Sequence, residues 1–311
     1  MKILHLDINH SMITKSLSTL GLKNDIDLTS NKFEIGNIIG AYDGLIVRSR
    51  IKIDKNLIDK AVNLKFVARV GSGTENIDCE YLMKKNIELI TSGEGNSNAV
   101  GEHTLGLLLD LSKKITKSHI EMQSNLRKRE ENRGFEIEGK TIGIIGYGKA
   151  GKSFARKLLG FNCNVIFNDL KKDLGDEYAK QVTFSKLKEK SDVISMHTDL
   201  NKLSHHLINK KFISDCKKPI YLLNTSRGEC VNTEDLIFAL KDGKVLGAGL
   251  DVLENETKSF FSLNDDVSFE EIKKFENVIL TPHTAGWSHE SKIKLAEVTV
   301  DKIKKFLGRK N

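Results

Sequence analysis

One stretch near the middle of the chain constrains the fold more than any other part of the sequence. From Gly139 to Asp169 a short apolar run, a glycine cluster, a helical pattern and a second apolar run follow one another. The first run, residues 141–145, suits a strand that is buried on both faces. The glycines have the spacing G-x-G-x-x-G at Gly146, Gly148 and Gly151. Strand, glycine turn, helix and strand in this order predict one βαβ unit of a parallel sheet.

Each glycine of this turn has a physical reason. Gly146 allows a tight turn, Gly148 lets a pyrophosphate approach the backbone, and Gly151 lets the helix pack closely on the strand. The helix N-terminus presents unpaired N–H groups to the phosphates. Asp169 ends the second run, where its carboxylate can accept hydrogen bonds from a ribose and repel a 2′-phosphate. The motif therefore predicts NAD in preference to NADP, bound by Gly146, Tyr147, Gly148, Lys149, Ala150, Gly151 and Asp169.

Composition limits the classes of protein that remain. A length of 311 residues with 39% hydrophobic and 29% charged residues is typical of a globular protein with about two domains. The net charge is +7, but the lysines are scattered among acids, which indicates a solvated surface and neither a nucleic-acid nor a membrane partner. No apolar run approaches a membrane span. Without an export signal or a C-x-x-C pair, the four cysteines indicate reduced thiols and a cytoplasmic location.

The pattern of the remaining chain predicts the fold class. Apolar runs at 3–6, 26–28, 44–47, 66–70 and 87–90 alternate with helical stretches, and the alternation resumes after Asp169. This predicts an α/β protein with two Rossmann-like or flavodoxin-like domains, each a doubly wound parallel sheet, and an active site in the cleft between them. The last helix, about 288–307, can cross back to the first domain. The expected domains are therefore 1–98 with 286–311, which binds substrate, and 99–285, which binds NAD.

A leucine-rich helix after Ala99 has apolar residues around much of its circumference. That pattern predicts burial between the domains or between subunits.

Three further segments carry chemical groups, each just after a predicted strand. They are residues 224–228 with Arg227, residues 249–256 with Glu256, and residues 281–283 with His283. Together with the glycine motif, this ordered set resembles the D-isomer-specific 2-hydroxyacid dehydrogenases over nearly the whole chain. Oxidation of a 2-hydroxy acid needs a base, for which His283 is suited because of its pKa. Glu256 can favour the protonated imidazole, and the Arg227 fork matches a carboxylate.

The resemblance implies roles for several positions. Arg227, Glu256 and His283 become the catalytic set, and Asp251 becomes the contact to the nicotinamide carboxamide. His197 and Thr198 match the segment near the adenosine. The remaining expected cofactor contacts are Thr225, Ser226 and His283. The chain departs from the family at Thr257 and Asp199, where proline is usual, so altered loop geometry is expected there and over 257–275. Trp287 can either line the pocket or pack in the interior.

Within the family, residues 45–49 and 68–78 are most similar to 3-phosphoglycerate dehydrogenases. That similarity implies oxidation of 3-phospho-D-glycerate in serine biosynthesis by a homodimer, with Arg129 supplied by the neighbouring subunit. It also implies a small anionic 2-hydroxy or 2-oxo acid, phosphorylated, as the partner. The Gly71–Gly73 loop would present backbone N–H groups to the carboxylate. The expected substrate-binding residues are Arg48, Ser49, Arg69, Gly71, Ser72, Gly73, Asn76, Arg129 and Arg227.

Other functions stay open on the sequence. Another reductase of the family would act on glyoxylate, hydroxypyruvate, D-lactate-type substrates or 4-phosphoerythronate. A non-enzymatic NAD-sensing corepressor shares the fold and even the catalytic residues. No metal is expected, because His205-His206 lacks the spacing of a ligand pair. Because the chain ends at Asn311, serine feedback through a C-terminal domain is not expected.

Overall fold

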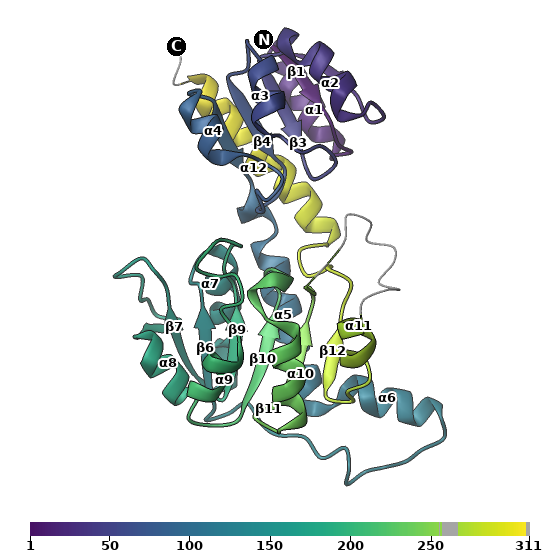
Figure 1. The fold of residues 1–311 in the computed structure, drawn as a ribbon, viewed down its shortest axis with the longest axis vertical. Helices are drawn as coiled ribbons and strands as arrows, with labels where there is room; N and C mark the ends of the chain where they lie inside the picture. Colours follow the sequence, from purple (N-terminus) through teal and green to yellow (C-terminus); the bar gives the residue numbers. More distant parts are fainter. Residues whose placement is uncertain (255, 257–266, 309–311) are drawn as a thin grey trace. The chain divides into compact units, whose positions relative to one another are not determined.

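The computed structural model describes residues 1–254, 256 and 267–308, and the chain divides into two compact units (Figure 1). The first unit comprises Met1–Ser97 and Trp287–Asn311, and the second comprises Asn98–Gly286. Each unit is built around a parallel sheet with helices on both faces, which confirms the predicted α/β class. The predicted departure at Thr257 lies outside the described residues.

The first unit has a five-stranded parallel sheet in the order β2-β1-β3-β4-β5. This order is flavodoxin-like, and the direction of winding reverses between β1 and β3. Its strands are β1 (Lys2–His5), β2 (Lys23–Ile26), β3 (Gly44–Val47), β4 (Phe66–Arg69) and β5 (Glu88–Thr91). Its helices are α1 (Ser11–Thr19), α2 (Lys32–Ile38), α3 (Lys55–Lys60), α4 (Cys79–Lys84) and α12 (His289–Gly308), with 3₁₀ turns η1 (Ile39–Ala41) and η2 (Gly93–Gly95).

Side chains of the central strands alternate between two cores, one on each face of the sheet. On β3, Leu45 and Val47 pack into one core and Ile46 into the other. The second core includes α1 and α12, so the last helix of the chain covers one face of the first sheet. One boundary differs from the sequence pattern, which placed the second strand at 26–28. Pairing of Lys2 with Lys23 sets the register of this edge strand and leaves Ile26 exposed.

The second unit has a seven-stranded parallel sheet in the order β12-β11-β10-β9-β6-β7-β8. Its strands are β6 (Thr141–Ile145), β7 (Asn164–Asn168), β8 (Lys180–Gln181), β9 (Val193–Met196), β10 (Ile220–Asn224), β11 (Val245–Leu250) and β12 (Val278–Leu280). Its helices are α5 (Ser97–Lys113), α6 (Ile115–Gln123), α7 (Lys149–Lys157), α8 (Phe184–Lys190), α9 (Lys210–Asp215), α10 (Thr233–Lys241) and α11 (Val267–Ile272), with 3₁₀ turns η3 (Leu158–Phe161) and η4 (Gly228–Cys230).

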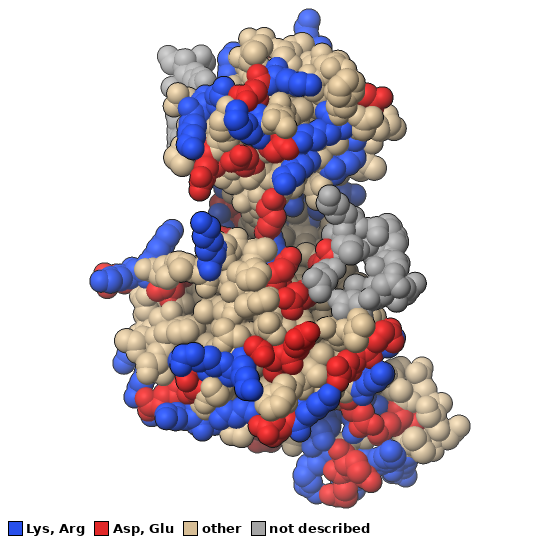
Figure 2. Space-filling model, in the orientation of Figure 1, with Lys and Arg blue, Asp and Glu red and all other residues tan. Residues whose placement is uncertain are grey.

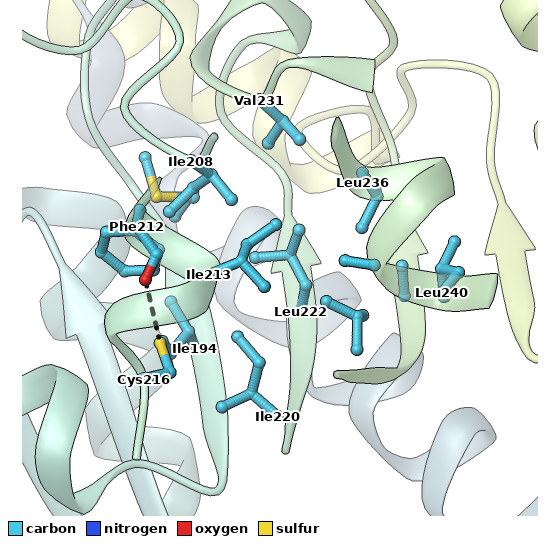
Figure 3. Packing of buried hydrophobic residues seen from close by; sticks show 14 of the residues in the cluster. Ile194, Ile208, Phe212, Ile213, Cys216, Ile220, Leu222, Val231, Leu236 and Leu240 are labelled. Carbon is cyan, nitrogen blue, oxygen red and sulfur yellow. Dashed lines mark hydrogen bonds between the residues drawn. The ribbon is translucent and has the colours of Figure 1, made fainter. Parts of the chain in front are cut away.

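Two buried clusters also cover the two faces of this second sheet. Figure 3 shows one of them, where Ile194 and Leu222 of the sheet meet Phe212 of α9 and Leu236 of α10. The leucine-rich helix α5 belongs to the other cluster: Leu107, Leu108 and Leu111 are buried there. The leucines of this helix therefore pack on the sheet of their own unit, and burial of the helix against another domain or subunit stays a prediction.

The surface of the described residues carries mixed charge. On the face drawn in Figure 2, lysines and arginines are interspersed with aspartates and glutamates. None of the helices in the described part of the chain is long and apolar enough to cross a membrane. Helix α6 differs from its neighbours because it has no buried residue and exposes Ile115, Ile120 and Met122. In Figure 1, α6 projects from the edge of the second unit.

Two glycines of α5 offer a test of how closely this helix packs on α7. A Cβ at Gly101 would lie 2.6 Å from the Ser153 hydroxyl oxygen and 3.0 Å from the Phe154 backbone nitrogen, whereas nothing lies within 4 Å of one at Gly106. We expect Gly101→Ala to cost about 1–3 kcal/mol by overpacking, which lowers the melting temperature by about 2–4 °C per kcal/mol. Gly106→Ala should be neutral or stabilising by up to ~1 kcal/mol. Thermal unfolding by circular dichroism compares them, and equal melting temperatures would contradict the packing.

Candidate active site

The glycine motif forms the turn from β6 to α7, and each of its three glycines meets a different environment. Gly146 has φ +89°, and a Cβ there would lie 2.6 Å from the carbonyl oxygen of His197. A Cβ at Gly151 would overlap the carbonyl oxygen of Gly146, so helix and turn pack backbone to backbone. At Gly148 nothing lies within 4 Å of the Cβ position. The space beside Gly148, at the N-terminus of the nine-residue α7, therefore suits a bound phosphate.

Asp169 and Tyr147 fix the geometry of the same turn. The Asp169 carboxylate follows β7 and accepts hydrogen bonds from the backbone N–H groups of Tyr147 (2.7 Å) and Lys171 (2.9 Å). The Tyr147 ring is buried, stacks on Phe167 and donates from its hydroxyl to Asp176. Its side chain supports the fold, whereas its backbone belongs to the turn. Lys149 and Ala150 form the first turn of α7.

His197 and Thr198 follow β9, beside the glycine turn. The imidazole of His197 is buried, and its Nε2 lies 2.8 Å from the Ser195 hydroxyl. Burial lowers the pKa of His197 to about 3, so the ring is neutral at physiological pH. The side chain of His197 therefore packs in the interior, and the carbonyl oxygen of His197 is the group that lies against Gly146.

His283 and Glu256 form a hydrogen-bonded pair after β12 and β11. The imidazole Nδ1 lies 2.7 Å from Oε2 of Glu256, whose Oε1 accepts from the backbone N–H of Leu253 at 2.8 Å. His283 has φ +53°, in the left-handed region that is uncommon for a residue with a side chain. Its N–H donates to the carbonyls of Asp251 and Thr281, which hold this backbone in place. Such strain is frequent at functional sites.

The charge of Glu256 determines the acidity of the imidazole. The hydrogen bond that Glu256 accepts raises the pKa of His283 above its usual value, while burial and the charge of Arg227 act in the opposite direction. The raised pKa favours the imidazolium near neutral pH, as a proton donor requires.

Asp251 is the buried centre of the loop that carries His283. Its carboxylate accepts hydrogen bonds from the Thr281 hydroxyl (2.6 Å) and from the N–H groups of Thr284 and Ala285 (2.8 Å each). His103 Nε2 lies 2.9 Å from the Thr281 hydroxyl and 3.4 Å from Asp251 Oδ1. Although burial raises it, these hydrogen bonds hold the pKa of Asp251 below its usual value. The carboxylate is consequently charged, and its contacts in the described structure all come from its own unit.

Arg227 follows β10 on a short braced loop. Asn224 accepts from the N–H and hydroxyl of Ser226, and its amide donates to the carbonyl of Arg227 at 2.8 Å. Arg227 donates from Nη1 to the Ser226 carbonyl at 2.6 Å, and Thr225 is 2.9 Å from the Thr104 hydroxyl of α5.

Gly228, the next residue, lies against the backbone of Leu253, because a Cβ there would overlap its carbonyl group. The loops that carry Arg227 and Glu256 are thus packed directly on each other.

The expected substrate residues of the first unit lie at the carboxyl ends of β3 and β4. Asn76 donates from its amide to the carbonyls of Arg48 and Ile51, so its side chain braces the loop. Arg69 donates to the Val70 carbonyl and lies against Gly71. The Gly71 N–H donates to the Ser92 hydroxyl at 3.0 Å. The Gly71 N–H is therefore already bonded, and presentation of the other N–H groups of the Gly71–Gly73 loop to a carboxylate stays a prediction.

The other expected substrate residues are Ser49, Ser72, Gly73 and Arg129, and they differ in exposure and location. Ser49 and Ser72 are exposed, and Gly73 is buried. Arg129 belongs to the second unit, in the exposed segment after α6, and no hydrogen bond or ion pair of its side chain is found among the described residues.

Sequence reasoning missed several residues that organise these loops. His103, Thr104 and Asn224 contact Thr281, Thr225 and Ser226, respectively. No local spacing links α5 to β12 or β10, so only the packed structure identifies them.

Comparisons with known proteins show which family the chain is similar to. Residues 105–285 match the family model "D-isomer specific 2-hydroxyacid dehydrogenase, NAD binding domain". A hydroxypyruvate reductase of Thermotoga maritima is 31% identical over 97% of each chain. A D-3-phosphoglycerate dehydrogenase of Bacillus subtilis is 32% identical over 85% of this chain and 49% of its own length. The crystal structure of a D-lactate dehydrogenase from Aquifex aeolicus with NAD and lactic acid superposes with a TM-score of 0.83, at 28% identity over 99% and 96% of the two chains.

The fold and the matched domain define an NAD-binding oxidoreductase with a Rossmann-type second unit. The chain belongs to the D-isomer-specific 2-hydroxyacid dehydrogenase family, and it is an NAD-dependent enzyme of that family. The predictions of family, fold class and cofactor are confirmed.

The His283–Glu256 pair generates a prediction about pH dependence. Glu256→Gln removes the largest influence that raises the pKa of His283, so that pKa should fall. Reduction of a 2-oxo acid requires the imidazolium, and its rate should therefore decline at a lower pH than in the wild type. Oxidation requires the neutral ring and should begin at a lower pH. Profiles of kcat/KM against pH in both directions measure this, with exposed Glu234→Gln as the control for loss of one charge. An unshifted profile would remove Glu256 from this role.

Proposed function

We propose that the protein oxidises 3-phospho-D-glycerate at C2 to 3-phosphohydroxypyruvate, with NAD as the hydride acceptor, in serine biosynthesis. The observation that carries the substrate assignment is Arg48, a partly buried guanidinium at the carboxyl edge of the first sheet. Its side chain makes no ion pair among the described residues, although the charge of the nearby Asp7 carboxylate acts on it. Arg227 in the second unit is suited to the substrate carboxylate, which leaves Arg48 for a second anionic group. Relatives named D-3-phosphoglycerate dehydrogenase, at 30–32% identity, support the same substrate.

The residues of the second unit supply the acid–base chemistry. In the oxidation, His283 accepts the proton of the C2 hydroxyl, and Glu256 stabilises the imidazolium that forms. Arg227 binds the substrate carboxylate and the adjacent oxygen through its fork of N–H groups. NAD, when bound, accepts the hydride from C2. Gly146–Gly151 and Asp169 would hold its pyrophosphate and its ribose, and the negative charge of Asp169 favours NAD over NADP. Asp251 and Thr225 orient these loops, with Asp251 contacting the carboxamide.

Binding of the phosphate involves Arg48 and Arg69 of one subunit and Arg129 of its neighbour in a homodimer. Helix α6 supports the dimer, because Ile115, Ile120 and Met122 are each more than half exposed on a helix with no buried residue. An apolar surface of this kind is typical of an interface between subunits. Arg129 lies in the segment that follows this helix. The four free cysteines agree with a reducing compartment such as the cytoplasm.

A second candidate, reduction of hydroxypyruvate or glyoxylate, is favoured by a different observation. The hydroxypyruvate reductase of Thermotoga maritima matches over 97% of both chains, whereas the Bacillus subtilis phosphoglycerate dehydrogenase is matched over 49% of its length. Neither small substrate carries a phosphate. Under this alternative function, Arg48 would therefore have no second anionic group of the substrate to bind.

A substrate panel tests the proposal. The protein is assayed at the NADH absorbance with 3-phospho-D-glycerate, D-glycerate, glycolate and D-lactate, and in reverse with hydroxypyruvate and glyoxylate, using NAD and NADP in parallel. We expect the highest kcat/KM for 3-phospho-D-glycerate, with NAD preferred. A higher kcat/KM for D-glycerate than for its phosphorylated form would assign the protein to the reductases.

Arg129 generates a prediction about the dimer. A desolvated, charge-assisted hydrogen bond contributes about 1.5–3 kcal/mol, so Arg129→Ala should raise the KM for 3-phospho-D-glycerate roughly ten- to a hundredfold and leave NAD binding unchanged. If Arg129 acts across the interface, mixing Arg129→Ala with Arg227→Ala subunits gives one site with both defects and one with neither. Activity should then partly return. A verified mixed dimer without recovery places Arg129 in its own subunit's site or outside any site.

A further inference from the structure

The guanidinium of Arg48 lies over the indole ring of Trp287, with 4.8 Å between Cζ and the ring centroid. Both residues belong to the first unit, although they are far apart in the sequence. Arg48 directly follows β3, and Trp287 lies two residues before the start of α12. Trp287 is the only tryptophan of the chain and is 69% exposed, which is unusual for so large an apolar side chain.

The backbone of Arg48 is fixed at the point where the winding of the first sheet reverses. Asp7, which comes after β1, accepts the N–H of Arg48 at 2.6 Å, and Asn76 donates to the Arg48 carbonyl at 3.0 Å. In sheets of this kind, ligands bind in the crevice outside the carboxyl ends of the two strands at the reversal. Arg48 and Trp287 therefore stand where the fold provides a binding site.

Three arginines lie near this edge, and their guanidinium groups have different partners. Arg50 donates to the carbonyls of Leu6, Ser30 and Asp27. Arg69 donates to the carbonyl of Val70. For Arg48, by contrast, the described residues provide no hydrogen-bond acceptor and no ion pair for the side chain. Partial burial lowers the pKa of Arg48, and the nearby Asp7 carboxylate opposes this shift without an ion pair to the guanidinium, whose N–H groups can therefore still bind an anion.

A guanidinium that lies over an aromatic ring keeps the N–H groups that a carboxylate partner would occupy. A carboxylate would occupy two N–H groups and cancel the charge, whereas an aromatic face attracts the cation through its quadrupole and accepts no N–H bond of the fork. A guanidinium held over a ring keeps its donors and is restricted in orientation. Trp287 can thus hold Arg48 in place and leave its N–H groups for a ligand.

We propose that Trp287 is a positioning residue that holds Arg48 ready to bind the phosphate group of the substrate, and so sets the preference for a phosphorylated 2-hydroxy acid. This inference rests on the proposed function, since it takes Arg48 as a substrate residue. Exposed Trp287 also makes the site observable, because its fluorescence is the only tryptophan emission of the protein.

The first experiment needs no catalysis. NAD-free protein is titrated with inorganic phosphate at constant ionic strength, and with D-glycerate in parallel, while tryptophan emission is recorded. We expect a saturable change with phosphate that is lost in Arg48→Ala. Phe33→Leu is the matched control, because it removes an exposed ring that lies under Lys60 on the same unit. A flat wild-type titration, a response that survives Arg48→Ala, or a response to D-glycerate alone would overturn the proposal.

The second experiment separates positioning from general structural support. Trp287→Leu should raise the KM for 3-phospho-D-glycerate roughly three- to tenfold with little change in kcat, and Trp287→Phe should restore most of the affinity. In an Arg48→Ala background, Trp287→Leu should cause no further increase in KM. Equal effects of Trp287→Leu in both backgrounds would show that the ring does not act through Arg48.

The outcomes distinguish this inference from the proposed function. If phosphate changes the emission through Arg48 but the substrate panel favours another acid, the phosphate site stands and the proposed substrate fails. If 3-phospho-D-glycerate is the best substrate but neither the emission nor the KM depends on Trp287, the substrate stands and the positioning role fails.

Discussion

The buried carboxylate of Asp251 is the interaction on which the loop that carries His283 depends. Three strands, β10, β11 and β12, end at the same edge of the sheet, and each is followed by a residue with a reactive side chain. Asp251 ties the loop after β12 to the end of β11 through Thr281, Thr284 and Ala285. A buried charge of this kind is tolerated only when its hydrogen bonds are made, so the loop that carries His283 has little freedom.

The pairing of His283 with Glu256 depends on that rigid frame. The left-handed backbone of His283 would be unfavourable in a free loop, and hydrogen bonds from its N–H to the carbonyls of Asp251 and Thr281 hold it. On the other side, Gly228 permits the Arg227 loop to lie on the backbone of Leu253, next to Glu256. The imidazole, the carboxylate and the guanidinium are therefore positioned by backbone contacts among loops, and the charge of Arg227 acts against the raised pKa of His283.

In the first unit, two neighbouring arginines place their guanidinium groups in different surroundings. Arg50 satisfies its guanidinium on backbone carbonyls, which makes it part of the loop structure. Arg48, two residues earlier, lies over Trp287 instead. Two arginines separated by one residue thus have different partners, backbone carbonyls for Arg50 and an aromatic ring for Arg48, and nothing in their local sequence distinguishes them.

The sequence by itself determined the family, the parallel α/β class and the cofactor, because these depend on short-range patterns. The glycine spacing, the acid after the next strand and the Arg, Glu and His after three strands are all local, and strand ends meet at one edge of any parallel sheet. Tertiary structure alone decided which surfaces are buried and which donors are occupied. It placed the α5 leucines in the core of their own unit, gave the Gly71 N–H to Ser92, and brought His103 to Asp251 and Trp287 to Arg48. Such contacts join residues far apart in the chain, where packing and not local pattern selects the partner.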